Sequence, residues 1–204
     1  MKKERRYMME LDIFTEKLAS NAPTPGGGGA SAAVAAIAAA LAHMSLALGA
    51  GKPKYADDEA EMRSLMSALD AMRTEFLALI DADAAAFLPL AAAYKSSDPE
   101  QKETALRNAA EPPMRIMELC AQALPLISGA YEICPRLALS DAGCAAVCCR
   151  AALSAASLNV LANTREMKDA QSAAALNARA AELLESACIA DAVYSAVRSA
   201  LGGD

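Results

Sequence analysis

The sequence predicts an all-α fold, a multi-helix bundle built around a buried, alanine-rich central helix. Apolar residues make up 55% of the 204 residues, and alanine runs recur along the chain. Trp is absent, and there are only five Tyr and three Phe. Such small side chains suit closely packed helices, whereas sheets favour β-branched and aromatic residues. A chain of this length suits one core, so we expect a single domain over residues 1–204.

The order of helices follows from apolar residues at helical spacing and from the glycines and prolines between them. The expected helices cover about 12–20, 30–48, 57–94, 98–112, 113–133, 141–163 and 168–201. Asp98 or Ser97 would cap the fourth helix, and Pro112 and Pro113 would interrupt it. The last helix carries an apolar stripe at steps of three and four. That stripe fits an internal contact of the bundle at least as well as a coiled coil between subunits.

Charge and hydropathy exclude several classes of protein. The formal net charge is −6, the wrong sign for general nucleic-acid binding. The segment 30–48 is long enough to cross a bilayer, but alanine dominates it and Ser31, His43 and Ser45 interrupt it. We therefore expect a central helix packed on all sides and no membrane contact. The first ten residues are positively charged, but alternating charged and apolar residues follow them in place of an uninterrupted apolar run, unlike a signal peptide. A cytoplasmic location is therefore expected.

The cysteines predict neither disulfides nor a metal site. Six cysteines lie among Ala, Leu and Val in helical patterns, which is typical of reduced core residues. Cys144 and Cys148 are four residues apart and could face one metal ion. However, the sequence has no CxxC motif, and its one histidine lies far away. We therefore expect no bound metal.

A glycine-rich segment directly precedes the alanine-rich helix. Pro23 and Pro25 are followed by Gly26, Gly27, Gly28 and Gly29. Four adjacent glycines cost backbone entropy on folding, which indicates that something approaches this backbone closely. Amides at a helix N-terminus can bind a carboxylate or phosphate. Equally, the glycines could let two helices cross tightly, and composition alone does not decide between these interpretations.

Other polar residues stand at informative places in the chain. The turn with Lys52, Lys54 and Tyr55 offers two cations and a phenol, although lysines of this kind are more often simply exposed to solvent. Asp81 and Asp83 lie among apolar residues and point about 200° apart on a helix, so at most one faces the core. The remaining candidates begin or end the helix over 141–163. They are Asp141 in the first turn, and Asn159 and Asn163 on one face at the end.

Four of these motifs occur together and in order. They are PTPGGGG at 23–29, GKPKY at 51–55, DADAAAF at 81–87, and SDAG at 140–143 continuing to NVLAN at 159–163. In this order they closely resemble the cyclodeaminase/methenyltetrahydrofolate cyclohydrolase family. The resemblance covers the chain from Phe14 to about Asn163. Four ordered motifs are far more specific than any single one.

Two positions depart from the pattern of that family. Members usually have a serine directly after three glycines, whereas Gly29 fills that place here and Ser31 follows two residues later. The basic turn is also reduced, because Pro53 replaces a lysine. A hydroxyl contact at the first position and the affinity for substrate are therefore in question.

The resemblance implies a folate one-carbon enzyme. Such an enzyme either hydrolyses methenyltetrahydrofolate to formyltetrahydrofolate or cyclises formiminotetrahydrofolate with loss of ammonia. It implies Asp83 and Asp141 as acid/base carboxylates, with Asn159 and Asn163 orienting the pterin or water. Folate-binding residues would be Pro25, Gly26, Gly27, Gly28, Lys52, Lys54 and Tyr55. No cofactor is implied, only the folate substrate as a partner, and the expected assembly is a homodimer with the central helices near the interface. A non-catalytic folate-binding protein or a structural helical oligomer is the alternative.

Overall fold

The computed structural model describes residues 11–203 of the chain, and within them every regular element is a helix. The N-terminal segment discussed above lies outside these residues. The elements are α1 (Leu11–Leu18), α2 (Gly27–Ala47), η1 (Pro53–Tyr55), α3 (Glu59–Ala93), α4 (Pro99–Ile133), η2 (Arg136–Ala138), α5 (Leu139–Thr164), α6 (Ala170–Leu184) and α7 (Ala187–Ala200). The all-α prediction is confirmed.

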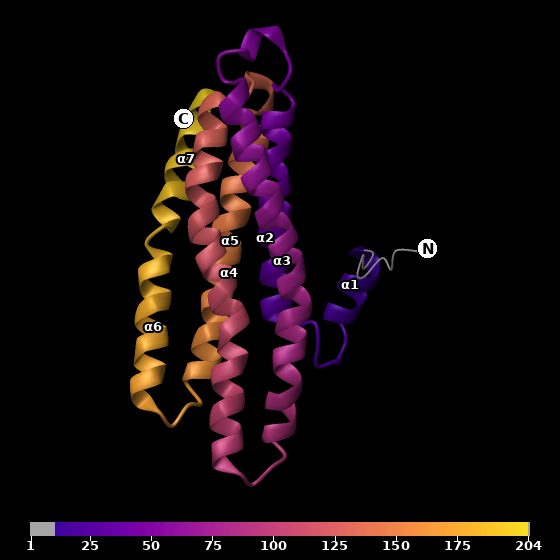
Figure 1. Cartoon of the computed structure of the whole chain (residues 1–204), viewed down its shortest axis with the longest axis vertical. Coiled ribbons are helices and arrows are strands. Elements are labelled where there is room, and N and C mark those ends of the chain that lie inside the picture. Colours follow the sequence, from indigo (N-terminus) through magenta and orange to yellow (C-terminus); the bar gives the residue numbers. More distant parts are fainter. Residues whose placement is uncertain (1–10, 204) are drawn as a thin grey trace.

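Four long helices, α2 to α5, form the centre of the bundle (Figure 1). Helix α2 packs against α3, α4 and α5, and α4 also packs against α3 and α5. The pair α6 and α7 lies along α5 and α4 on one side, whereas the short α1 stands on the opposite side of the molecule (Figure 1). The main core therefore lies between α2, α3, α4 and α5.

Alanines form much of this core because they let helix axes approach closely. On α2 the side chains of Ala32, Ala35, Ala39 and Ala42 are at most 1% exposed. The expectation that α2 is packed on all sides is wrong, because its remaining face is open and Ile37 is 47% exposed there. Helix α2 is thus buried on the faces towards its neighbours and exposed on one side.

Three segments of the described chain are long and apolar enough to cross a membrane, judged by length and composition alone: Gly27–Ala47, Glu59–Ala93 and Arg136–Thr164. In the structure they form α2, α3 and η2 with α5, which pack on one another in the bundle. Half of the most apolar window of α2 is buried in these contacts. The apolar character of these segments therefore serves, at least in part, the packing of helix on helix.

Helix α4 continues through the prolines that we expected to interrupt it. Proline removes a backbone donor and leaves the carbonyl four residues earlier without its helical partner. Pro112 and Pro113 are buried in the bundle, and the carbonyl of Ala109, which Pro113 cannot serve, accepts a hydrogen bond of 3.1 Å from Asn163 Nδ2 on α5. Tertiary packing and a substitute donor thus keep the helix continuous. Asp98 caps α4 as predicted, accepting bonds from the amides of Glu100 and Gln101.

Three further details differ from the sequence prediction. Helix α2 begins at Gly27, so three of the four glycines are helical and Gly26 is the N-cap. The last predicted helix is divided at residues 185–186 into α6 and α7, and four members of its stripe face the bundle: Ala180, Leu183, Ala190 and Val197. These four residues make an internal contact, whereas Tyr194 and Leu201 of the same stripe are 50% and 60% exposed. Among the cysteines, Cys144 and Cys188 are exposed and do not belong to the core.

Neighbouring alanines on α5 offer a matched test of this tight packing. Ala152 is 1% exposed, whereas the preceding Ala151 is on the surface. Ala152→Leu should lower the free energy of unfolding by about 1–3 kcal/mol, because the extra methylenes do not fit between the helices. Ala151→Leu should change it by less than about 0.5 kcal/mol. Urea unfolding followed by circular dichroism measures both, and equal stabilities of the two variants would contradict the packing described here.

Candidate functional site

A cavity of about 260 Å³ lies where α2 begins. Helices α3 and α4 each have 35 residues, whereas α2 has 21. The neighbouring helices therefore extend past the N-terminus of α2, and the cavity lies in the space between them there. The lining residues are Pro23, Thr24, Gly26, Gly27, Gly28, Asp83, Phe87, Leu90, Tyr94, Ala109, Asn159, Ala162 and Asn163.

The carboxylate of Asp83 meets the backbone of the glycine-rich segment in this cavity. The amide of Gly29 donates a hydrogen bond of 2.9 Å to Asp83 Oδ2. A Cβ atom on Gly28 would lie 2.0 Å from Asp83 Oδ1, far inside van der Waals contact. Gly28 is therefore needed for the close approach of a side chain. The interpretation in which glycines only let two helices cross does not describe this position.

Two features of the surroundings of Asp83 shift the pKa of its carboxyl in opposite directions. Burial raises the pKa of the Asp83 carboxyl above its ordinary value of 3.8, and the hydrogen bond from the Gly29 amide partly opposes this effect. Among the described lining residues, Asp83 is the one carboxylate. Asp81 instead lines a groove between α1, α2 and α3, so the prediction that at most one of the two faces the core is confirmed.

The two asparagines share a face of α5 as predicted, but their hydrogen bonds differ. Asn159 donates to the carbonyl of Ala155 at 2.9 Å, and its side-chain oxygen would lie 3.0 Å from a Cβ on Gly27. Asn163 donates to the carbonyls of Asn159 and Ala109 at 2.9 and 3.1 Å. Asn163 thus joins α5 to α4 at the wall of the cavity, whereas Asn159 keeps its oxygen at the glycine end.

An apolar wall that the sequence analysis missed completes the cavity. Phe87, Leu90 and Tyr94 follow Asp83 at steps of four, three and four along α3, so all four side chains lie on one stripe of the helix. The helical spacing of these apolar residues from Asp83 is visible in the sequence. Spacing alone does not show whether such a stripe lines a cavity or packs in the core.

The structure does not bring the other predicted residues into the cavity of the same chain. Asp141 precedes Asn159 by eighteen residues on α5, which is about 27 Å along the helix axis. Lys52, Lys54 and Tyr55 lie in and next to η1, beyond the other end of α2, and the helix axis between is about 30 Å long. The segment that joins α2 to α3 and contains η1, and the N-terminal end of α5, are both at the top of the bundle in Figure 1. Within one chain they form no site with Asp83.

The contacts of Ser31 and Gly29 show what takes the place of the serine that the family pattern has after three glycines. Ser31 donates to the carbonyl of Gly27 at 2.7 Å within its own helix, so its hydroxyl does not replace the missing serine. A Cβ on Gly29 would meet Pro25 at 3.4 Å and Asp83 Oδ2 at 3.9 Å, which are ordinary contacts. Pro25 packs beside Gly29 and does not line the cavity.

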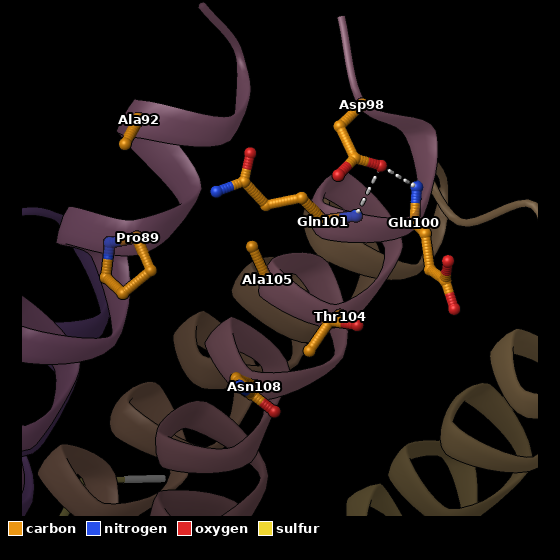
Figure 2. Close-up of a pocket in the computed structure, with 8 residues that line it drawn as sticks. All are labelled: Pro89, Ala92, Asp98, Glu100, Gln101, Thr104, Ala105 and Asn108. Carbon is orange, nitrogen blue, oxygen red and sulfur yellow. Dashed lines mark hydrogen bonds between the residues drawn. The ribbon is translucent and has the colours of Figure 1, made fainter. Parts of the chain in front are cut away.

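A second depression, of about 390 Å³, lies between the ends of α3 and α4 (Figure 2). It lacks comparable chemistry, since Asp98 there accepts two backbone bonds as a helix cap, and Pro89 and Ala92 form the opposite wall. Over residues 11–203 no three His, Cys, Asp or Glu side chains group in a way that could hold a metal ion. The cavity at Asp83 combines a half-buried carboxylate with helix amides that have no acceptor within the described residues, an arrangement that the depression between α3 and α4 lacks.

Comparison with known proteins finds relatives that match most of the chain. The chain is 32% identical over 199 residues to a methenyltetrahydrofolate cyclohydrolase of Methylorubrum extorquens, covering 93% of this chain and 96% of that protein. It is 30% identical over 168 residues to the formimidoyltransferase-cyclodeaminase of Rattus norvegicus, covering 78% of this chain and 31% of the rat protein.

A solved structure extends the similarity to the whole fold. The crystal structure of a formiminotetrahydrofolate cyclodeaminase from Thermotoga maritima superposes with a TM-score of 0.84 at 30% identity, covering 96% of this chain and 97% of that one. Residues 10–182 match the family described as formiminotransferase-cyclodeaminase. The chain therefore belongs to the formiminotransferase-cyclodeaminase family.

Proposed function

We propose that the chain is a folate one-carbon enzyme that transforms the carbon held between N5 and N10 of tetrahydrofolate, with Asp83 as the acid/base group. The observation that carries this proposal is a single half-buried carboxylate with a raised pKa, held by the Gly29 amide at the base of a cavity. The substrate class comes from the cyclohydrolase and cyclodeaminase relatives. The sequence prediction of a folate substrate is retained in this proposal.

In the hydrolytic direction one carboxylate can serve both proton transfers. Asp83 accepts a proton from water as the water oxygen bonds to the cationic methenyl carbon. The bond from that carbon to N5 then breaks, its electron pair stays on N5, and Asp83 returns the proton to N5. The remaining hydroxyl loses its proton to solvent and leaves a formyl group on N10. The ionised carboxylate also stabilises the cationic substrate before attack.

The cyclodeaminase reaction uses the same groups in another order. The formimino group enters as its protonated amidinium form, and attack of N10 on its carbon turns the formimino nitrogen into an amino group. Asp83 accepts the N10 proton and passes it to that amino group, and the bond from carbon to this nitrogen breaks, so that ammonia leaves and the methenyl cation remains. The amides of Gly27 and Gly28 have no acceptor among residues 11–203. They belong to the first turn of α2, beside Asp83. They are placed to bind an oxygen of the pterin. No metal or redox cofactor takes part in either scheme.

Replacement of Asp83 separates catalysis from folding. Asp83→Asn should lower kcat for methenyltetrahydrofolate hydrolysis, or for cyclisation of the formimino compound, by at least about 100-fold. In the wild type, kcat/KM should fall as pH falls through the Asp83 pKa, which burial places above 3.8. Absorbance of the methenyl chromophore measures both reactions. Turnover unchanged in folded Asp83→Asn would exclude the assigned role.

The same variant should not lose stability at neutral pH. A carboxyl whose pKa is raised by folding stabilises the folded state at low pH, and this contribution is lost as pH rises through the window above 3.8. Asn cannot ionise and still offers an oxygen to the Gly29 amide. The free energy of unfolding of Asp83→Asn relative to wild type should therefore increase from acid towards neutral pH, as measured by urea titration.

Two adjacent glycines provide a second test of the site. Gly28→Ala places a Cβ on the Asp83 carboxylate and should displace it, so kcat should fall at least about tenfold. Gly29→Ala makes only ordinary contacts and should retain activity. Both variants gain helix propensity of about 1 kcal/mol, which in Gly28→Ala offsets part of the cost of displacing the carboxylate, so both should remain folded in circular dichroism. Equal kcat values for the two variants would show that the approach of Asp83 to Gly28 is not needed.

The predicted homodimer has support in the surface of α2. Ile37 and Met44 on α2 and Leu77 on α3 are 41–47% exposed, and they lie on the side of the molecule where α1 stands. An apolar groove of about 410 Å³ runs between these helices. We expect a second copy to cover this face. Only from a second copy could Lys52, Lys54, Tyr55 or Asp141 reach the cavity at Asp83.

A charge on this face should prevent association. Ile37→Glu should convert the protein from dimer to monomer, because the carboxylate would be buried without a partner. Leu201→Glu, which alters a 60% exposed leucine at the end of α7, is the matched control and should stay dimeric. Multi-angle light scattering gives the mass of each variant. A monomeric wild type would contradict the homodimer.

A further inference from the structure

The inference concerns the two asparagines on α5, because the structure fixes which way each side-chain amide points. Asn163 uses both hydrogens of its Nδ2 atom, one for the carbonyl of Ala109 and one for the carbonyl of Asn159. Asn159 turns its own Nδ2 atom to the carbonyl of Ala155. A reversed amide would set an oxygen against these carbonyls, so in both side chains Oδ1 is the atom that remains for another partner.

These two oxygens are open to the cavity. Both asparagines line it, and both are half-buried. Among residues 11–203 no group donates a hydrogen bond to either Oδ1 atom, and no buried side-chain oxygen lacks a partner. The two oxygens are therefore accessible, and they are acceptors that a ligand can reach.

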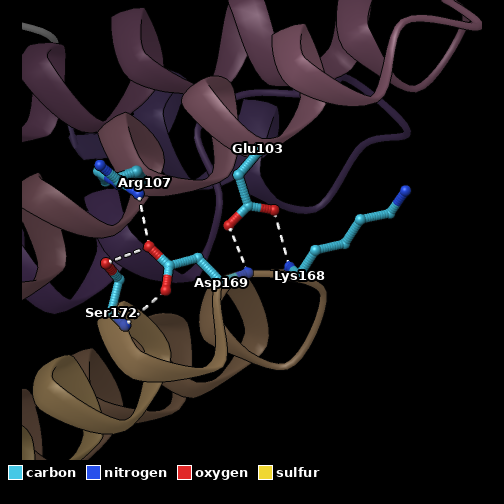
Figure 3. A network of polar contacts seen from close by, with 5 residues as sticks. All are labelled: Glu103, Arg107, Lys168, Asp169 and Ser172. Atoms are coloured by element: carbon cyan, nitrogen blue, oxygen red, sulfur yellow. Dashed lines mark hydrogen bonds and ion pairs between the residues drawn. The ribbon is translucent and has the colours of Figure 1, made fainter.

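The turn that follows these asparagines is tied to α4 (Figure 3). Glu103 on α4 accepts bonds from the amides of Lys168 and Asp169 at 2.7 and 3.1 Å. Arg107, also on α4, pairs with the Asp169 carboxylate at 3.1 Å, and this carboxylate accepts a bond from Ser172 as well. The end of α5 is thus held against α4, so both acceptors are in place before a ligand binds.

Donors and acceptors follow one another along the cavity wall in a definite order. The amides of Gly27 and Gly28 are donors without an acceptor in the described part of the chain. Asn159 Oδ1 lies next to them, 3.0 Å from the place of a Cβ on Gly27. Asn163 is one helical turn further along α5. From α2 outwards the wall therefore presents donors, then one acceptor, then a second acceptor.

The pyrimidine edge of a 2-amino-4-oxo pteridine has the complementary order. Its O4 atom accepts, its N3–H donates and its 2-amino group donates. O4 is also peri to N5, so it lies beside the carbon held between N5 and N10. If that carbon is at Asp83, as the proposed function requires, O4 lies at the first turn of α2, which the Asp83 carboxylate contacts.

We propose that the cavity recognises the pyrimidine edge of the folate through this order of groups. The first amides of α2 bind O4, Asn159 Oδ1 accepts from N3–H, and Asn163 Oδ1 accepts from the 2-amino group. The inference rests on the proposed function and deepens it, because it makes the asparagines specificity residues for a 2-amino-4-oxo pteridine. A 4-amino group would set a donor against the amides, and N3 would lose the hydrogen that Asn159 accepts.

Two matched ligands test this recognition by calorimetry, without turnover. Folic acid has the 2-amino-4-oxo edge, and aminopterin differs from it only by a 4-amino group in place of the 4-oxo group. Wild type should bind folic acid at least about tenfold more tightly than aminopterin. Asn159→Leu should weaken binding of folic acid about tenfold and change that of aminopterin less than about twofold, so most of the preference is lost. Asn108→Leu, at the depression between α3 and α4, is the control and should keep it.

The role of Asn163 is tested on the ligand as well as on the protein, because this side chain also bonds to α4. Folic acid without its 2-amino group should bind wild type about fivefold to tenfold more weakly than folic acid. Asn163→Leu should bind the two compounds alike. The comparison on wild type needs no variant, so it tests the assignment even if Asn163→Leu fails to fold.

Steady-state kinetics separate this role from an action on the attacking water. Asn159→Leu should raise KM for methenyltetrahydrofolate about fivefold to tenfold and lower kcat less than about threefold. A loss of kcat at unchanged KM would mean that Asn159 acts on water, and this would overturn the inference. Equal binding of folic acid and aminopterin by a wild type that turns over the folate would also overturn it. If wild type turns over neither the methenyl nor the formimino compound, the proposed function fails instead.

Discussion

The contact between the Asp83 carboxylate and the first turn of α2 is the constraint on which the site depends. One carboxylate oxygen accepts a hydrogen bond from the Gly29 amide, and the other occupies the space that a side chain on residue 28 would fill. The positive end of the helix and the buried carboxylate therefore face one another without an intervening side chain. This arrangement keeps an ionisable group at the base of a cavity and balances the cost of its burial with a backbone donor. The Gly29 amide thus holds a protein carboxylate, while the preceding amides of Gly27 and Gly28 have no acceptor among residues 11–203.

The cavity exists because α2 is shorter than its neighbours, and the neighbours must then remain apart without it. Asn163 fixes the spacing of α4 and α5 at this level through its bond to the Ala109 carbonyl, which Pro113 leaves free. A proline and an asparagine far apart in sequence therefore form one structural element across α4 and α5. Asn159, one turn earlier on α5, has its side-chain oxygen close to Gly27 and free for the cavity.

The sequence predicted the helical class, most helix positions and half of the site. Periodicity located the long helices, since apolar spacing records which face is buried, but it could not show that a tertiary donor would carry α4 through Pro113. The glycines, Asp83, Asn159 and Asn163 were identified, and they do meet in one cavity. Lys52, Lys54, Tyr55 and Asp141 were grouped with them because motif order carries no distance, and the length of α2 separates them. Phe87, Leu90 and Tyr94 belong to no motif, and their place in the cavity wall depends on where α2 begins.

Because the cavity lies past the N-terminus of α2, its length depends on how far α3 and α4 extend. The hairpin that joins α3 to α4, residues 94–98, lies at the far end of the molecule from η1 (Figure 1). Whole helical turns inserted symmetrically on both sides of this hairpin would lengthen the cavity wall and leave the alanine contacts of α2 unchanged. The reach of the pocket towards longer or shorter ligands can therefore evolve by insertion and deletion at one end, independently of the residues that carry out the chemistry.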